Sequence, residues 1–150
     1  MISLNIDKDF YIEKLQYTKY SNNLLILCEE SDSESGTGDV FLINGDNLKT
    51  LLKNRITGFN VGEPVIKGRY IYVSAICFIG KIDLETGNYV WKHELNYNDN
   101  PHRYNAFNKP EFSGSNVIFN DTDRSNPKDG IVPFGFIKVD DESGKILEMK

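Results

Sequence analysis

Two histidines are the residues in this sequence best suited to acid–base chemistry. His93 and His102 are the only ones, and a segment rich in Asn and Asp separates them. A pair of imidazoles can serve as general acid and general base, as in phosphodiester cleavage. Because no recurrent catalytic motif surrounds either residue, we favour ordinary surface histidines around a loop. A small hydrolase that uses His93 and His102 remains the alternative.

The segment 121–129 begins like a calcium-binding loop, because oxygen-bearing side chains occupy its first, third and fifth positions. An EF-hand loop needs Gly at the sixth position and Glu at the twelfth, where this chain has Asn126 and Val132. A solvated hairpin loop is therefore the better interpretation. We predict no catalytic residue, no metal ligand and no cofactor.

Acidic side chains gather in one stretch of 18 residues that contains no Lys or Arg. Long-range attraction would guide a basic protein toward such a stretch, whereas the simpler interpretation is an acidic loop in water. We predict the first five of its acids as partner-binding residues. The six acids are Glu29, Glu30, Asp32, Glu34, Asp39 and Asp46.

A second candidate surface lies in the segment 97–104. Its residues Tyr97, Arg103 and Tyr104 are of the types enriched at the energetic centres of protein interfaces. We include these three side chains in the predicted partner-binding set, with an ordinary connecting loop as the alternative.

The elements that must carry these residues are short β-strands. Aromatic residues make up 12% of the 150 residues, and many lie in β-branched runs such as 70–73, 116–119 and 136–139. Gly, Asn, Asp and Ser bound these runs, as turns require. Only the leucines of segment 47–52 hint at a helix. The length favours one domain, and the pattern predicts an all-β protein.

An internal repeat organises the chain. Segment 79–92 resembles segment 136–149, with Asp83 aligned on Asp140 and Gly87 on Gly144. A fainter copy places Asn44 in the position of Asp83. The sequence therefore divides into three repeats, at about 10–55, 56–100 and 101–150, and a period of roughly 40–50 residues made of short strands is typical of propeller blades.

The turn of the second repeat resembles the Asp-x-x-Thr-Gly-x-x-x-Trp motif of quinoprotein-type (PQQ-like) β-propeller blades. The matching residues are Asp83, Thr86, Gly87 and Trp91. The third repeat keeps Asp140, Ser143 and Gly144 and has Glu148 in place of Trp. The resemblance implies a blade-like fold in which the Trp packs between neighbouring blades.

Three blades are too few to close a ring, since closed propellers have about 4–8. We therefore predict one domain, 1–150, in which three antiparallel blade-like sheets form an open half-propeller. A twisted β-sandwich is the alternative. A second copy of the chain or a bound partner could cover the open faces.

The net charge of −5 disfavours direct nucleic-acid binding and suits a basic protein partner. The sequence begins without a signal-peptide pattern, and its apolar runs are too short to cross a bilayer, so we expect a cytoplasmic protein with no membrane partner. Cys28 and Cys77 lie in apolar runs, which favours buried free thiols over a disulfide.

In overall character the chain resembles the stand-alone immunity proteins of bacterial contact-dependent growth inhibition systems. The resemblance implies a non-enzymatic protein that binds and neutralises a cognate toxin domain. We expect that domain to be basic and of nuclease type, because toxins that act on nucleic acid usually carry positive charge. A structural propeller module that forms a homodimer is the alternative.

Overall fold

The computed structural model describes residues 11–31, 36–47, 50–57, 61–95, 106–122 and 135–150. Within these residues the chain forms twelve β-strands and no helix. The strands are β1 Tyr11–Tyr20, β2 Asn23–Ser31, β3 Gly36–Ile43, β4 Thr50–Thr57, β5 Val65–Lys67, β6 Tyr70–Ala75, β7 Phe78–Asp83, β8 Tyr89–Glu94, β9 Glu111–Ser113, β10 Asn116–Asn120, β11 Phe136–Asp140 and β12 Ile146–Met149. In the part of the chain that the structure describes, no helix could cross a membrane.

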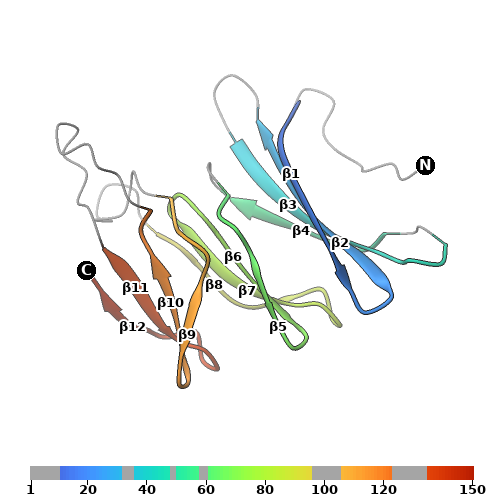
Figure 1. The fold of residues 1–150 in the computed structure, drawn as a ribbon. Helices are drawn as coiled ribbons and strands as arrows, with labels where there is room; N and C mark the ends of the chain where they lie inside the picture. Colours follow the sequence, from blue (N-terminus) through green and yellow to red (C-terminus); the bar gives the residue numbers. More distant parts are fainter. Residues whose placement is uncertain (1–10, 32–35, 48–49, 58–60, 96–105, 123–134) are drawn as a thin grey trace. The chain divides into compact units, whose positions relative to one another are not determined.

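The twelve strands form three antiparallel sheets of four strands each (Figure 1). Sheet 1 contains β1–β4, sheet 2 contains β5–β8 and sheet 3 contains β9–β12, and in each the strands neighbour one another in chain order. The predicted all-β class with three antiparallel blade-like sheets is confirmed. The chain divides into two compact units, Met1–Phe59 and Asn60–Lys150. That the three repeats make one domain stays a prediction.

The three sheets share a β-bulge at equivalent positions of their third and fourth strands. The strand register shifts between Leu42 and Ile43 in sheet 1, between Lys81 and Ile82 in sheet 2, and between Lys138 and Val139 in sheet 3. A bulge adds one residue to one strand and bends it. The shared irregularity supports the sequence repeat, because unrelated sheets have no reason to bulge at the same position.

Segment 47–52, in which leucines hinted at a helix, is not helical where it is described. Strand β4 begins at Thr50, which pairs with Ile43, and Leu52 pairs with Leu42 of β3. Pairing with an existing strand overrides the weak helix propensity of two or three leucines.

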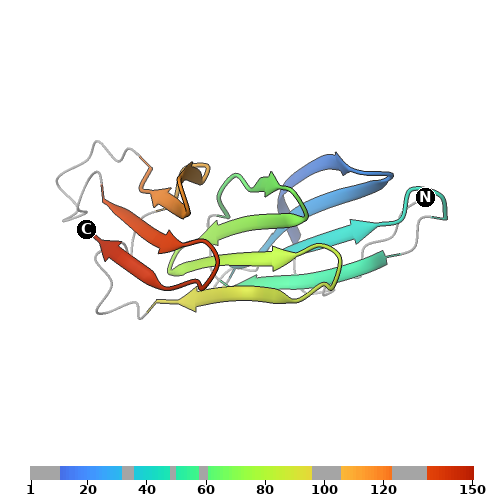
Figure 2. The same ribbon diagram turned by 90° about the horizontal axis from the view of Figure 1, so that it is seen from below.

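Sheets 2 and 3, drawn in green to red in Figure 2, belong to the second unit. Buried apolar side chains from both sheets form one cluster. In sheet 3 the core arises from alternation, since successive side chains of a strand point to opposite faces, whereas β7 of sheet 2 is buried throughout. The β10 and β11 patterns alternate buried and half-buried residues throughout. The buried cluster comprises Tyr72, Ile79 and Trp91 of sheet 2, Val117, Phe119, Ile137 and Val139 of sheet 3, and Phe107.

Candidate functional site

The best-defined polar cluster lies where sheet 2 meets the turn between β11 and β12, and the turn itself comes from the sequence repeat. The N–H of Gly144 donates to the carbonyl of Asp140 at 2.9 Å, and the N–H of Gly87 donates to the carbonyl of Asp83 at 2.8 Å. Both glycines have positive φ, 75° and 78°. Asp83–Gly87 and Asp140–Gly144 therefore form equivalent hairpin turns, as expected from the alignment of the two repeats.

The first side chain of each turn caps the backbone that follows it. Oδ1 of Asp140 accepts hydrogen bonds from the N–H of Ser143 at 2.8 Å and from its hydroxyl at 2.6 Å. Oδ1 of Asp83 accepts from the N–H of Glu85 at 2.9 Å. In the first unit, Oδ1 of Asn44 accepts from the amides two and three residues on. Asn44 thus caps the turn of the first repeat, as Asp83 and Asp140 cap the turns of the second and third.

The hydroxyl and amide of Ser143 hold the pKa of Asp140 below its ordinary value of 3.8. A carboxylate with a lowered folded-state pKa adds stability above its unfolded pKa and loses that stability as the pH falls through the folded pKa. Asp140→Asn should therefore lower the free energy of unfolding at pH 7, and this difference from wild type should shrink below about pH 4.

Urea unfolding followed by Trp91 fluorescence at pH 7, 5 and 3 would measure the effect of Asp140→Asn. The control is Glu142→Gln, which neutralises an exposed carboxylate in the same turn. A deficit of equal size at pH 3 and pH 7 would contradict the assigned role of the ionised Asp140.

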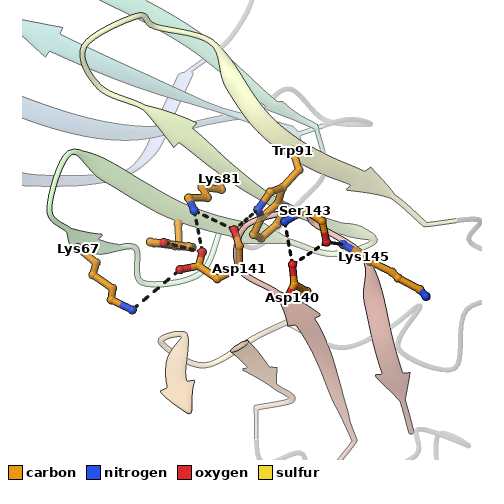
Figure 3. Close-up of polar contacts among 8 residues, drawn as sticks. Lys67, Lys81, Trp91, Asp140, Asp141, Ser143 and Lys145 are labelled. Atoms are coloured by element: carbon orange, nitrogen blue, oxygen red, sulfur yellow. Dashed lines mark hydrogen bonds and ion pairs between the residues drawn. The ribbon is translucent and has the colours of Figure 1, made fainter. Parts of the chain in front are cut away.

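Trp91 docks on this turn. Its side chain is 7% exposed, and its indole N–H donates to the main-chain carbonyl of Asp141 at 3.0 Å (Figure 3). The indole lies so close to Gly144 that an added Cβ there would be 2.5 Å from Cβ and Cγ of Trp91. The prediction that Trp91 packs in the core between the second and third repeats is confirmed.

Asp141 is the centre of the cluster, as Figure 3 shows. Its Oδ1 accepts from the hydroxyl of Tyr72 at 2.7 Å and from Nζ of Lys81 at 2.8 Å, and its main-chain oxygen accepts from the same Nζ at 2.8 Å. Lys67 adds a longer ion pair of 3.9 Å to Oδ2. Residues of β5, β6, β7 and β8 therefore converge on a single turn residue of sheet 3.

The ammonium of Lys81 is buried and needs this partner. The residue is 5% exposed, and a buried charge is costly unless it is paired and hydrogen-bonded. Aromatic rings also surround it, with Nζ 4.3 Å from the ring centre of Tyr70 and 5.4 Å from that of Tyr72. Burial, and then the hydrogen bond to Asp141, raises the pKa of Tyr72, so its hydroxyl stays protonated and can donate.

Asp141 was not among the predicted site residues, because it aligns with the apolar Leu84 of the second repeat. One signal was present in the sequence: Lys81 lies in the run 75–82, whose other residues are all apolar or Gly. A lysine in such a run is almost never left without an acidic partner. The sequence could have raised the question of a partner without naming it.

His93 takes part in the same junction. Its Nε2 lies 2.6 Å from the carbonyl oxygen of Gly144, and because a carbonyl only accepts, Nε2 is the donor. The ring centre lies 6.1 Å from that of Trp91. His102 lies outside the described residues, so the alternative of a hydrolase that uses both histidines stays untested.

The predicted partner-binding residues fall mostly where the structure gives no description. Asp32, Glu34, Tyr97, Arg103 and Tyr104 lie outside the described residues. Glu29 and Glu30 belong to β2 and Asp39 to β3, while their side chains lie outside the description. Asp46 is exposed in the turn after β3. Their role in binding stays a prediction.

Asp121, the first residue of the calcium-like segment, is buried. Its Oδ2 accepts from the N–H of Gly135 at 3.1 Å, which ties the end of β10 to the start of β11. The residues between 123 and 134 lie outside the described part of the chain. Cys77 lies half-buried in the turn between β6 and β7, and the side chain of Cys28 lies outside the described residues.

No protein-family model matches this sequence, and no curated protein matches it. Among solved structures, the chain is similar to BamB from Moraxella catarrhalis, with a TM-score of 0.51 and 9% sequence identity. BamB is a β-propeller. The fold is β-propeller-like. The match covers 94% of this chain and 52% of BamB, so this chain spans about half the length of BamB. At this identity the likeness concerns the fold alone.

Proposed function

We propose that this chain is a non-enzymatic binding protein built from PQQ-like blade repeats. More specifically, we propose a cytoplasmic immunity protein of a bacterial contact-dependent growth inhibition system. Its partner is a basic toxin domain of nuclease type, which it neutralises by covering the toxin's active site. The repeats supply a rigid scaffold, and the loops and the acidic stretch supply the contacts.

The observation that supports the proposal is that polar side chains between sheets 2 and 3 are hydrogen-bonded to one another or to the backbone. Lys81 and Tyr72 bond to Asp141, and His93 bonds to the backbone of Gly144. A general acid or base must reach a substrate proton, whereas these groups are engaged in holding one sheet to the next. Their arrangement favours a scaffold over a catalytic cleft.

The charge of the chain favours a basic partner. The net charge is −5, and six acids lie between residues 29 and 46 without a Lys or Arg. Opposite charge raises the association rate of two proteins more than it slows their dissociation. Toxin domains that act on nucleic acid need positive charge to approach phosphates, so an acidic inhibitor suits them.

Co-expression tests this function directly. The proposal predicts that a neighbouring gene encodes a toxin domain, and this domain should stop growth of a host cell when expressed alone. Co-expression of this chain should restore growth, and the purified pair should form a complex of fixed stoichiometry. Full toxicity in the presence of the folded protein would refute the proposal.

Neutralising four acids together should slow association with the toxin domain by about tenfold at low salt, and this difference should shrink in 1 M salt, where the Debye length is about 3 Å. The change is Glu29→Gln, Glu30→Gln, Asp32→Asn and Glu34→Gln. Surface plasmon resonance at two salt concentrations measures it.

A matched control removes the same charge elsewhere. It replaces four exposed glutamates by Gln, at Glu63, Glu94, Glu111 and Glu142. If both fourfold variants slow association equally, net charge acts and the acidic stretch is not a landing site. If the first variant associates like wild type, the stretch has no part in binding.

A second candidate is a structural module that pairs with another copy. The match that covers 94% of this chain covers 52% of BamB, so two copies would supply the length of the longer chain. Light scattering after gel filtration distinguishes the two candidates. A stable dimer that does not dissociate when the toxin domain is added would favour this second one.

A further inference from the structure

The two clear turns of the second unit differ at one position that decides how each can pack. Turn Asp140–Gly144 has Asp141 in second place, and turn Asp83–Gly87 has Leu84 there. Asp141 accepts four hydrogen bonds from the docking face of sheet 2, whereas Leu84 is a buried apolar side chain. By docking face we mean Tyr72, Lys81 and Trp91, which are cross-strand neighbours.

Of the two turns, only the one that contains Asp141 offers a carboxylate to the buried ammonium of Lys81. Nζ of Lys81 bonds to both the carboxylate and the main-chain oxygen of Asp141, each at 2.8 Å. A turn with leucine in that place would offer the carbonyl alone and leave a buried ammonium without a counter-charge. Such an unpaired buried charge is strongly destabilising, whereas an apolar pair of similar volume is not.

Sheet 3 has a lysine, Lys138, at the position equivalent to Lys81, but its cross-strand neighbours differ. Ile118, Lys138 and Glu148 are the cross-strand neighbours equivalent to the docking face. Glu148 thus replaces Trp91 and lies opposite Lys138 in the ladder, where opposite charges attract, while its ion pair at 2.8 Å is with Lys150. Lys138 is half-buried and has an acid opposite it in its own sheet, whereas Lys81 is 5% exposed and its ion pair is with Asp141 of sheet 3.

We infer that the Lys81–Asp141 pair determines which turn the docking face of sheet 2 accepts. Repeats with equivalent turns risk docking in the wrong order, either within one chain or on the equivalent turn of a second copy. Lys81 forms a buried ion pair with the turn that contains Asp141 and would be left unpaired against a turn that contains Leu84. This difference in free energy favours docking of sheet 2 on the turn of sheet 3. The inference is independent of the partner proposed above.

Three full-length variants test the selection. Asp141→Leu copies the Leu84 turn and leaves Lys81 unpaired. Lys81→Met combined with Asp141→Leu makes both sides apolar, and Lys81→Glu combined with Asp141→Lys reverses the pair. Each is unfolded and refolded at several concentrations, and melting is followed by the fluorescence of Trp91, the only tryptophan. Light scattering after gel filtration then gives the mass of each refolded species.

Asp141→Leu should melt roughly 10 °C below wild type. The apolar double variant should regain at least half of that loss, yet refold into additional species of higher mass whose share rises with concentration. The reversed pair should refold into the single distribution of wild type. An apolar double variant that refolds like wild type would overturn the inference. So would Asp141→Leu melting like wild type, or a double variant no more stable than Asp141→Leu.

Discussion

Replacing Trp91 by alanine should lower the free energy of unfolding by about 3–5 kcal/mol, the usual cost of removing a large buried aromatic side chain. The indole is 7% exposed and lies in the cluster that joins sheets 2 and 3. Its loss would leave a cavity and remove a donor to Asp141. Because the variant has no tryptophan, urea unfolding is followed by far-ultraviolet circular dichroism.

Two controls separate the causes of that loss. Trp91→Phe keeps most of the apolar area and loses the indole N–H, so we expect a smaller cost than for alanine. Val90→Ala changes the neighbouring residue, which is 44% exposed, and should stay within about 0.5 kcal/mol of wild type. If Trp91→Ala costs no more than Val90→Ala, Trp91 does not hold the sheets together.

Gly144→Ala should destabilise the chain by roughly 2–5 kcal/mol, through two separate effects. The backbone φ of 75° strains any residue with a Cβ, which costs about 1–2 kcal/mol. The new Cβ would also lie 2.5 Å from Cβ and Cγ of Trp91, so the docked ring must move, and such overpacking costs about 1–3 kcal/mol more. Urea unfolding measures the sum.

Gly114→Ala is the matched control for Gly144→Ala. Gly114 also has a positive φ, 59°, but an added Cβ there meets no atom within 4 Å. It should show the conformational cost alone, about 1–2 kcal/mol. Equal losses at the two glycines would show that Trp91 does not lie against Gly144.

The turns and strands of this fold could be predicted from the sequence because hydrogen bonds between residues close in the chain specify them. Asp83 and Asp140 bond to amides within three residues, and Gly87 and Gly144 supply positive φ, so each turn is specified by neighbours in the chain. In the same local way, Asn44 caps the turn that follows β3. Strands and repeats follow because their signals lie within short windows.

The docking contacts lie beyond such windows. Lys81 and Asp141 are 60 residues apart, and Tyr72 and Asp141 are 69 apart. Their meeting depends on how two sheets face each other, which no local pattern encodes. The β-bulges were likewise not foreseen, because the extra residue is visible only once the strand register is known. The leucines of segment 47–52 suggested a helix from a local pattern, but pairing with the distant strand β3 determines the structure there.

Hydrogen exchange of the Trp91 indole N–H tests the docking of sheet 2 on sheet 3 most directly. Trp91 is the only tryptophan, so its indole gives one assignable signal in a ¹H–¹⁵N spectrum. The indole N–H is buried and donates to Asp141 at 3.0 Å, so it should exchange as slowly as the core amides of β7, and Gly144→Ala should speed it strongly. Exchange in wild type at the rate of a free indole would contradict the docking of Trp91 on the turn of sheet 3.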